Sequence, residues 1–256
     1  MTKTTKQLII ANWKMRLSLK ETAVLTKALA TSLNKQAGAA DLVLCPSYPA
    51  LPVVADLLKG KKIALGAQDV FWKAKGAYTG EVSGDMLKDL GVSYVLVGHS
   101  ERRQYLKETD QMVQHKVATA LAEGLIPVLC VGETFTERQL GQKDVVVSRQ
   151  VEKALAGVVL GSKDKLVVAY EPVWVIGSGQ AVTGDEAQHS ARVIRQGLIN
   201  LLPGKVVENQ VRIIYGGSVD AGNIGDFLPA SVMNGVLVGT ASLDEKSFTA
   251  LVKEVV

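Results

Sequence analysis

The sequence predicts an α/β fold in which eight parallel strands and their connecting helices close into a (β/α)8 barrel. Short apolar runs rich in β-branched residues occur eight times along the chain. Longer segments with helical spacing separate these runs, and strand followed by helix, repeated, indicates parallel strands joined by crossovers. The chain has 256 residues, which is the usual length for eight such units.

The elements follow one another regularly. The expected strands are QLIIAN (7–12), DLVLC (41–45), KIALGAQ (62–68), SYVLVG (93–98), LIPVLCVG (125–132), LVVAYE (166–171), VRIIYG (211–216) and GVLVG (235–239). They are apolar on both faces, as strands covered on both sides must be. Helical spacing is clear in LKETAVLTKALATSL (19–33) and DQMVQHKVATALAEG (110–124), and HSERR (99–103) should be helical too. Thr183 with Glu186 predicts a capping box at the start of another helix.

The same pattern leaves one alternative architecture open, a doubly wound open sheet. No linker rich in Pro, Gly or Ser and no shift in composition divides the chain. We therefore expect a single domain over residues 1–256.

Charge and cysteine content narrow the class of protein. The formal net charge of +4 is spread along the chain, which argues against a nucleic-acid or membrane partner. Cys45 and Cys130 each end an apolar run, so we expect buried free thiols and a reducing compartment. The N-terminus lacks the pattern of a signal peptide and no apolar run is long enough to span a membrane, so we expect a soluble, cytoplasmic protein.

Polar residues and glycines gather directly after the expected strands. In a barrel of this kind the active site lies at the C-terminal ends of the strands. An acid, an imidazole, a cation and several glycines there suit proton transfer on a small anionic substrate, although each alone also fits an ordinary role, such as a surface lysine or a helix-capping histidine. The residues are Asn12 and Lys14 after the first strand, His99, Ser100 and Glu101 after the fourth, Glu171 after the sixth, Tyr215, Gly216, Gly217 and Ser218 after the seventh, and Gly239 and Thr240 after the eighth.

A phosphate group fits these glycines better than other anions do. Backbone N–H groups after the seventh and eighth strands can point at one oxyanion, with a short final helix adding its positive end. A dinucleotide is less favoured, because the motif Gly177-Ser178-Gly179 lacks its third glycine at Val182, and no P-loop lysine is present. No group of His, Cys, Asp and Glu has the spacing of metal ligands, so no metal is expected.

Several ordered motifs carry a resemblance along essentially the whole chain. They are NWKM (12–15), GAQDV (66–70), GAYTGE (76–81), GHSERR (98–103), YEPVWVIGSG (170–179), YGGSV (215–219) and VLVGTASL (236–243). On these motifs the chain resembles the triosephosphate isomerase family. The resemblance implies a TIM barrel and an enzyme that interconverts dihydroxyacetone phosphate and D-glyceraldehyde 3-phosphate through an enediolate, without a cofactor.

The resemblance also implies a role for each matching residue. Glu171 is the base, His99 is a neutral electrophile, and Lys14, paired with Glu101, is the cation beside the substrate oxygens. A positive helix end disfavours imidazolium, and a low-dielectric site strengthens the charge of Lys14, so both roles are physically sensible. Asn12 helps to line the pocket of the carbonyl oxygen, and the backbone N–H groups that hold phosphate belong to Gly177, Ser218, Gly239 and Thr240.

A lid follows Glu171, from Pro172 to about Thr183, and is longer than the usual strand-to-helix loop. Pro172, Val173 and Trp174 form a constrained hinge, and Gly177 and Gly179 can take unusual dihedral angles. Closure would exclude water and strengthen the carboxylate as a base. Tyr215 and Ser218 match the residues that latch the lid. Thr240, Val175 and Ser178 depart from the commonest family pattern, which bears on phosphate affinity and lid motion.

The resemblance further implies a homodimer. The third loop, FWKAKGAYTGEVSGDM (71–86), carries Phe71, Trp72 and Tyr78 among glycines, and we expect this aromatic display to be exposed until a partner covers it. The family pattern places Thr79, Tyr78 and Gln68 at the dimer interface, with Thr79 near the neighbouring Lys14 and His99.

Two other functions remain as alternatives. Another phosphate-binding barrel enzyme, such as a different sugar-phosphate isomerase, would share the phosphate end of the site without combining Lys14, His99 and Glu171. A non-catalytic relative acting as an interaction protein would be expected to lose at least one of those three residues.

Overall fold

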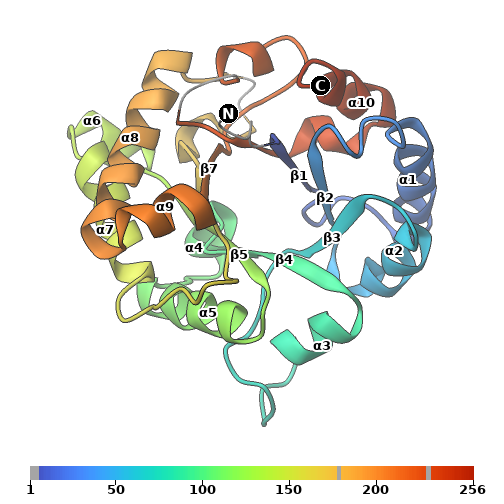
Figure 1. The fold of residues 1–256 in the computed structure, drawn as a ribbon, viewed down its shortest axis with the longest axis horizontal. Helices are drawn as coiled ribbons and strands as arrows, with labels where there is room; N and C mark the ends of the chain where they lie inside the picture. The colour runs from blue at the N-terminus through green and yellow to red at the C-terminus, as the bar shows by residue number, and fades with distance from the viewer. Residues whose placement is uncertain (1–5, 178–179, 229–231) are drawn as a thin grey trace.

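The computed structural model describes residues 6–177, 180–228 and 232–256, and in these residues eight strands form one closed parallel barrel. Figure 1 shows the strands in the centre and the helices around them, in chain order. The strand order is β1 to β8, and β8 pairs with β1 through Leu8–Gly235 and three further pairs. The prediction of a (β/α)8 barrel is confirmed, and the open sheet is wrong.

Every expected strand segment contains one strand, and no bound differs by more than one residue. The strands are β1 Leu8–Asn12, β2 Asp41–Cys45, β3 Ile63–Ala67, β4 Val92–Val97, β5 Ile126–Val131, β6 Leu166–Tyr170, β7 Val211–Tyr215 and β8 Gly235–Val238. The α-helices of the described residues are α1 Leu19–Ser32, α2 Leu51–Leu58, α3 Gly84–Asp89, α4 Ser100–Tyr105, α5 Asp110–Ala122, α6 Phe135–Gln139, α7 Lys143–Ala154, α8 Gly184–Leu201, α9 Gly204–Gln210 and α10 Glu245–Lys253. Short 3-10 turns are η1 Tyr48–Ala50, η2 Val173–Val175, η3 Ile224–Asp226 and η4 Thr240–Leu243.

Side-chain caps define where several helices begin. Ser18 and Glu21 form a complete capping box at α1, in which each side chain satisfies a backbone N–H of the other residue. The box predicted at α8 is only half present. Glu186 N donates to Thr183 Oγ1 at 3.2 Å, but the Glu186 carboxylate instead pairs with Arg138 of α6. The first turn of α8 is thereby joined to α6.

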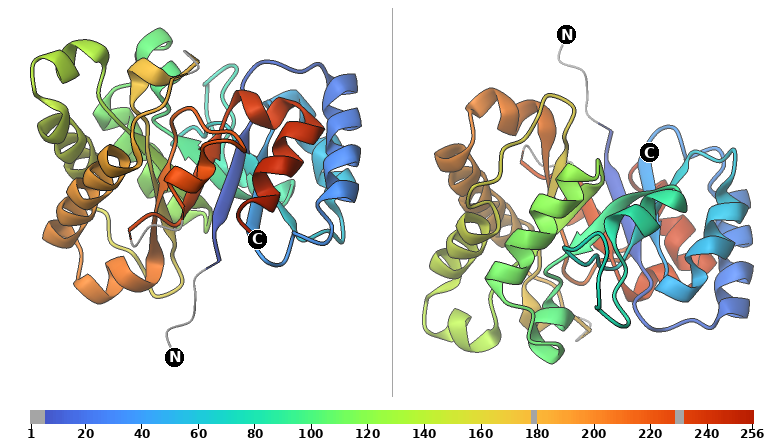
Figure 2. Two further views of the ribbon diagram at one scale, coloured as in Figure 1. Left: turned by 90° about the horizontal axis from the view of Figure 1, so that it is seen from above. Right: turned by 90° about the horizontal axis from the view of Figure 1, so that it is seen from below.

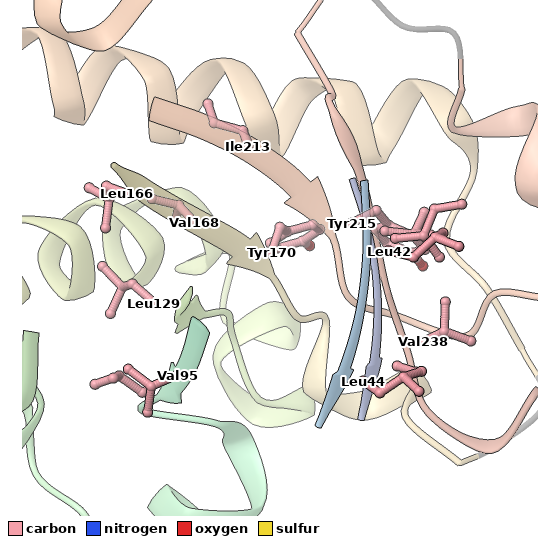
Figure 3. Packing of buried hydrophobic residues seen from close by; sticks show 14 of the residues in the cluster. Leu42, Leu44, Val95, Leu129, Leu166, Val168, Tyr170, Ile213, Tyr215 and Val238 are labelled. Atoms are coloured by element: carbon pink, nitrogen blue, oxygen red, sulfur yellow. The ribbon is translucent and has the colours of Figure 1, made fainter. Parts of the chain in front are cut away.

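Alternate residues of each strand supply two separate hydrophobic layers. Leu8 and Ile10 pack in the barrel interior with residues such as Val128 and Ala169, whereas Ile9 and Ala11 pack outward with the helices. Figure 3 shows part of the outer layer. Both layers are fully buried, which explains why the strands read as apolar on both faces.

The two cysteines are buried free thiols, as predicted. Burial raises the pKa of both thiols. No described helix is both long and apolar enough to cross a membrane.

A buried ionic cluster lies beneath α4. Lys116 Nζ contacts Asp69 Oδ1 at 2.6 Å and Glu108 Oε2 at 2.7 Å, and Arg102 pairs with the same two carboxylates at 2.8 and 2.6 Å. Burial raises the pKa of Asp69 to about 6, although Lys116 opposes the rise. Burial also acts to raise the pKa of Glu108, but the contacts with Lys116 and Arg102 outweigh this effect, so the pKa is lowered. The cluster joins the end of β3 to α4 and α5.

The third loop extends away from the ring of helices between β3 and α3, as Figure 1 shows. Tyr78 is 44% exposed, and Thr79 is exposed as well. The expectation of a fully exposed aromatic display is wrong for Phe71, which is 9% exposed. Its ring packs on those of Trp72 and Tyr78, at centroid distances of 4.2 and 4.7 Å. The aromatic residues thus stiffen the loop internally and leave Tyr78 at its surface.

We predict that Lys116→Met lowers the free energy of unfolding by roughly 3–5 kcal/mol, because it leaves two buried carboxylates without the more deeply buried of the two cations that they share. The matched control is Lys59→Met. Lys59 also pairs with an aspartate at 2.7 Å, but both side chains are more than 70% exposed, so its loss should leave stability nearly unchanged. Urea unfolding at one protein concentration measures both values. Equal effects of the two substitutions would contradict this reading of the cluster.

Candidate active site

The C-terminal ends of the strands surround a pocket of about 360 Å3. Figure 2 (left) shows this end of the barrel as the one away from the start of β1. The pocket is lined by residues that follow β1, β4, β6, β7 and β8, namely Asn12, Lys14, His99, Glu171, Ile176, Gly177, Gly216, Gly217, Ser218, Val219, Asp220, Leu237, Gly239, Thr240 and Ala241. The ends of five strands that are far apart in the sequence therefore meet at one small volume.

Glu171 follows β6 and its side chain is 2% exposed. Its backbone N–H continues the sheet by donating to Val131 O at 2.7 Å. One carboxylate oxygen, Oε2, accepts the backbone N–H of Ser100 at 3.0 Å, and Oε1 lies 3.3 Å from His99 Nε2. A buried carboxylate with few hydrogen bonds is a reactive one, because little of the solvation that it has in water is replaced.

His99 is the N-cap residue of α4, which begins at Ser100 as expected from the sequence. Its Nδ1 accepts the backbone N–H of Glu101 at 3.2 Å. An accepting Nδ1 carries no proton, so the proton of the neutral ring belongs on Nε2, which faces Glu171.

Lys14 lies on the loop after β1 in a strained backbone conformation, with φ of 51°. Three hydrogen bonds hold it. Its N–H donates to Asn12 Oδ1 at 3.0 Å, its carbonyl accepts Gln68 Nε2 at 2.8 Å, and its Nζ donates to Glu101 Oε1 at 2.7 Å. Gln68, which the family resemblance assigns to a subunit interface, therefore contacts Lys14 of its own chain. It also donates to Cys45 O, at 2.9 Å.

Glycine-rich strand ends form the rest of the pocket. Gly216, Gly217 and Ser218 follow β7, and Gly239 lies so close to Lys14 that a Cβ there would be 3.5 Å from Lys14 Cε. Thr240 begins η4. Tyr215 is buried beneath this end, stacked on Phe227 at a centroid distance of 4.0 Å. Burial raises the pKa of Tyr215, and the neighbouring backbone of Val182, at the far end of the lid, opposes the rise.

The lid begins with a 3-10 turn over 173–175, and Gly177 has φ of 75°, a value that favours glycine. Trp174 Nε1 donates to Glu133 Oε1 at 2.9 Å, and the guanidinium of Arg138 lies 4.3 Å from the Trp174 ring. Burial raises the pKa of Glu133, while the hydrogen bond from Trp174 opposes the rise. Ser178 and Gly179, which the sequence analysis includes in the lid, lie outside the described residues.

Ser100, expected only as one of the polar residues after the fourth strand, supports Glu171, and Gly132 and Glu133 are supports of the site that the sequence did not predict. Gly132 shows the tightest constraint, since a Cβ at this position would lie 1.7 Å from Glu171 O. Glu133 is fully buried and also accepts the Tyr170 hydroxyl at 3.2 Å. The signal was available in the dipeptide Gly132-Glu133, which follows β5 as the other site residues follow their strands.

The sequence of this chain is similar to the sequences of known proteins. The sequence model of the family described as "Triosephosphate isomerase" matches residues 7–255. The chain belongs to the triosephosphate isomerase family. A relative named triosephosphate isomerase from Carboxydothermus hydrogenoformans is 46% identical over 248 residues, covering 97% of this chain and 98% of the relative. Relatives of the same name from Dictyoglomus thermophilum and Moorella thermoacetica are 44% and 45% identical, covering 97% and 96% of this chain and 99% and 98% of the relatives.

Membership of the triosephosphate isomerase family makes the chain an isomerase, and the residues that line the pocket are those on which the sequence resemblance rests. Among the described residues, no group of three or more His, Cys, Asp or Glu side chains could hold a metal ion. Lys14, His99 and Glu171 line the pocket together with glycine-rich backbone.

We predict that Gly132→Ala lowers turnover by about 10-fold or more, because the new methyl group must displace the backbone of Glu171, and small displacements of a reacting group are costly. Gly204→Ala is the control, since a Cβ there meets nothing within 4 Å. Steady-state kinetics with glyceraldehyde 3-phosphate measure the effect. Wild-type turnover in a folded Gly132→Ala variant would contradict the proposed constraint.

Proposed function

We propose that the chain interconverts dihydroxyacetone phosphate and D-glyceraldehyde 3-phosphate by moving one proton between neighbouring carbons. One observation carries the proposal. Lys14, His99 and the buried Glu171 line the same 360 Å3 pocket, opposite glycine-rich strand ends. His99 Nδ1 accepts a hydrogen bond, as the unprotonated nitrogen of a neutral ring does. A three-carbon phosphate ester is small enough for that volume. Its phosphate end needs the glycine-rich backbone, and its reacting carbons need the three side chains.

The phosphate end of the substrate is assigned to backbone groups. Gly177, Ser218, Gly239 and Thr240 line the pocket on the side of β7, β8 and the lid. Glycines allow the chain to approach a phosphate closely, and backbone N–H groups donate without titrating. Gly239 lies beside the Lys14 side chain, so this anion-binding end is next to the reacting end.

The reacting end is assigned to three side chains. Glu171 removes a proton from one carbon and returns it to the neighbouring carbon. Negative charge develops on the substrate oxygens in between, and His99 Nε2–H and the Lys14 ammonium stabilise it. Asn12 supports this arrangement by accepting the N–H of Lys14, and Glu101 holds Lys14 through an ion pair at 2.7 Å. Each role depends more on the position of the side chain than on its intrinsic reactivity. The surrounding hydrogen bonds provide this positioning.

The lid controls water and completes the site. The N–H of Ser100 holds the Glu171 carboxylate in place. Closure of the lid would remove water from around Glu171 and keep the enediolate from losing its phosphate. Pro172 and Val173 at the hinge, Trp174 on Glu133, and Tyr215 beside Val182 are the contacts through which the lid would move and latch.

A homodimer is the assembly that we propose. The third loop extends from the barrel with Tyr78 and Thr79 exposed, and a two-fold symmetric pair would exchange identical loops. Thr79 would then lie near Lys14 and His99 of the second copy. The buried thiols Cys45 and Cys130 support a reducing compartment such as the cytoplasm.

A coupled assay on glyceraldehyde 3-phosphate tests the function directly. Conversion that is lost together in Lys14→Ala, His99→Ala and Glu171→Ala variants supports the proposal. Binding of a phosphate ester without turnover would favour the non-catalytic alternative. Turnover of another sugar phosphate, with none of this triose, would favour a different isomerase.

We predict that Glu171→Asp reduces turnover by about 10²-fold while changing substrate affinity far less, since the carboxylate is retained but drawn back by about one bond length. Glu152→Asp, an exposed position on α7, is the control and should be neutral. The measurement is kcat and KM in both directions. An unchanged kcat would exclude Glu171 as the base.

We predict that Thr79→Arg separates the subunits and lowers activity in proportion. An unpaired charge in an interface costs roughly 3–5 kcal/mol, enough to shift a stable dimer toward monomer at micromolar concentration. The control is Thr31→Arg on the exposed surface of α1. Sedimentation and activity across one dilution series measure both quantities. A fully active Thr79→Arg monomer would contradict the proposed exchange of loops.

A further inference from the structure

A second pocket lies behind Glu171, on the side away from the substrate pocket. Its volume is about 700 Å3, and it lies between α4, the segment after β5 with α6, and the first residues of the lid. Glu171 is the residue that both pockets share. Ser100, whose N–H holds the Glu171 carboxylate, and Trp174 of the lid also line the second pocket.

The lining combines apolar surface with aromatic rings. Cys130 and Val131 are buried in the barrel wall, and Val173 belongs to the lid. Phe135 and Trp174 contribute two aromatic side chains, and Phe135 is 55% exposed. Such surfaces bind the flat face of an aromatic ligand.

Three cationic side chains line the same pocket, and they have more N–H donors than they use. Arg103 uses Nε on Gly98 O and Nη1 on Asp110, but its buried Nη2 has no acceptor among the described residues. Lys107 donates to Gln104 O, and no carboxylate of the described residues lies within 4.0 Å of its Nζ. Arg149 reaches Glu137 only at 3.8 Å.

The three acidic residues of the lining are already engaged. Asp110 accepts from Arg103 at 2.6 Å, Glu137 completes the capping box of Thr134, and Glu171 accepts from Ser100. Glu171 Oε1 is a buried oxygen without a hydrogen bond, whereas Arg103, Lys107 and Arg149 each keep unused donors. The balance suits an anionic group, and a carboxylate matches the planar fork of an arginine.

We propose that this pocket is a regulatory site for a small aromatic carboxylate. The carboxylate binds Arg103 Nη2 and the Lys107 ammonium, and the ring packs on Phe135 and Trp174. A ligand there contacts Trp174 and the Glu171–Ser100 hydrogen bond from behind. It opposes the movement of the lid and of the base without entering the substrate pocket, so it lowers kcat more than it changes KM. This kinetic consequence rests on the proposed function, whereas binding does not.

Calorimetry with 2-naphthoate tests the binding, with uncharged 2-naphthamide as the matched probe. We expect 2-naphthoate to bind at least about 5-fold more tightly than the amide, because the charge-assisted hydrogen bonds are lost with the amide. Saturating inorganic phosphate, directed at the substrate pocket, should leave this affinity within about 2-fold. Equal binding of acid and amide, no binding of either, or displacement by phosphate overturns the proposal.

Variants at the exposed rim locate the site without touching the catalytic groups. Phe135→Ala and Lys107→Gln should each weaken 2-naphthoate binding by about 5-fold or more and leave turnover without the ligand unchanged. Arg195→Gln, 40% exposed on α8, is the control and should change neither value. In the wild type, 2-naphthoate should lower kcat with KM nearly constant. If the rim variants bind 2-naphthoate as tightly as the wild type does, the proposed site is overturned. Binding with no effect on kcat overturns its regulatory role, and a chain that binds but turns over no triose would refute only the proposed function.

Discussion

Closure of the sheet between β1 and β8 is the constraint on which the rest of the structure depends. Gly235 makes this closure possible, because a Cβ there would lie 1.9 Å from Leu8 O. Once the ladder closes, the loops after the first and last strands become neighbours. Lys14 then packs against Gly239, and Trp13 Nε1 donates to Ser242 O at 3.1 Å. The cationic and the phosphate-binding ends of the site are adjacent because the barrel has no open edge.

Alternation along the strands determines which side chains reach the pocket. Val167 and Ala169 point into the barrel interior, and Glu171 continues the same alternation just beyond the end of β6. Leu8 and Ile10 lead to Asn12 in the same way, and Leu237 leads to Gly239. A one-residue shift in register would turn these groups toward the helices, so the packing of the interior layer and the geometry of the site are one requirement.

Two buried polar clusters connect the stability of the fold to the positions of the reacting groups. Glu108, a member of the Lys116 cluster, accepts the N–H of Gly98 at 3.1 Å, one residue before His99. Glu133 holds Tyr170 and Trp174, the residues on either side of the Glu171 segment. Buried carboxylates of this kind are costly without their partners, so the strands that carry His99 and Glu171 are fixed by charge pairing as well as by packing.

The sequence by itself determined the eight strands, their parallel order, and which polar residues follow them, because hydrophobic runs, spacing and local motifs are properties of neighbouring residues. It also led to the triosephosphate isomerase family. Only the tertiary structure decided that Gln68 supports Lys14 and that Phe71 is buried by Trp72 and Tyr78. It also decided that Glu186 pairs with Arg138 in place of completing a capping box. Only the tertiary structure decided, likewise, the close approach of Gly132 to Glu171 and the second pocket next to Glu171. Apart from the ring packing within the third loop, each of these contacts joins segments that are distant in the sequence, and their geometry exists only after the barrel has closed.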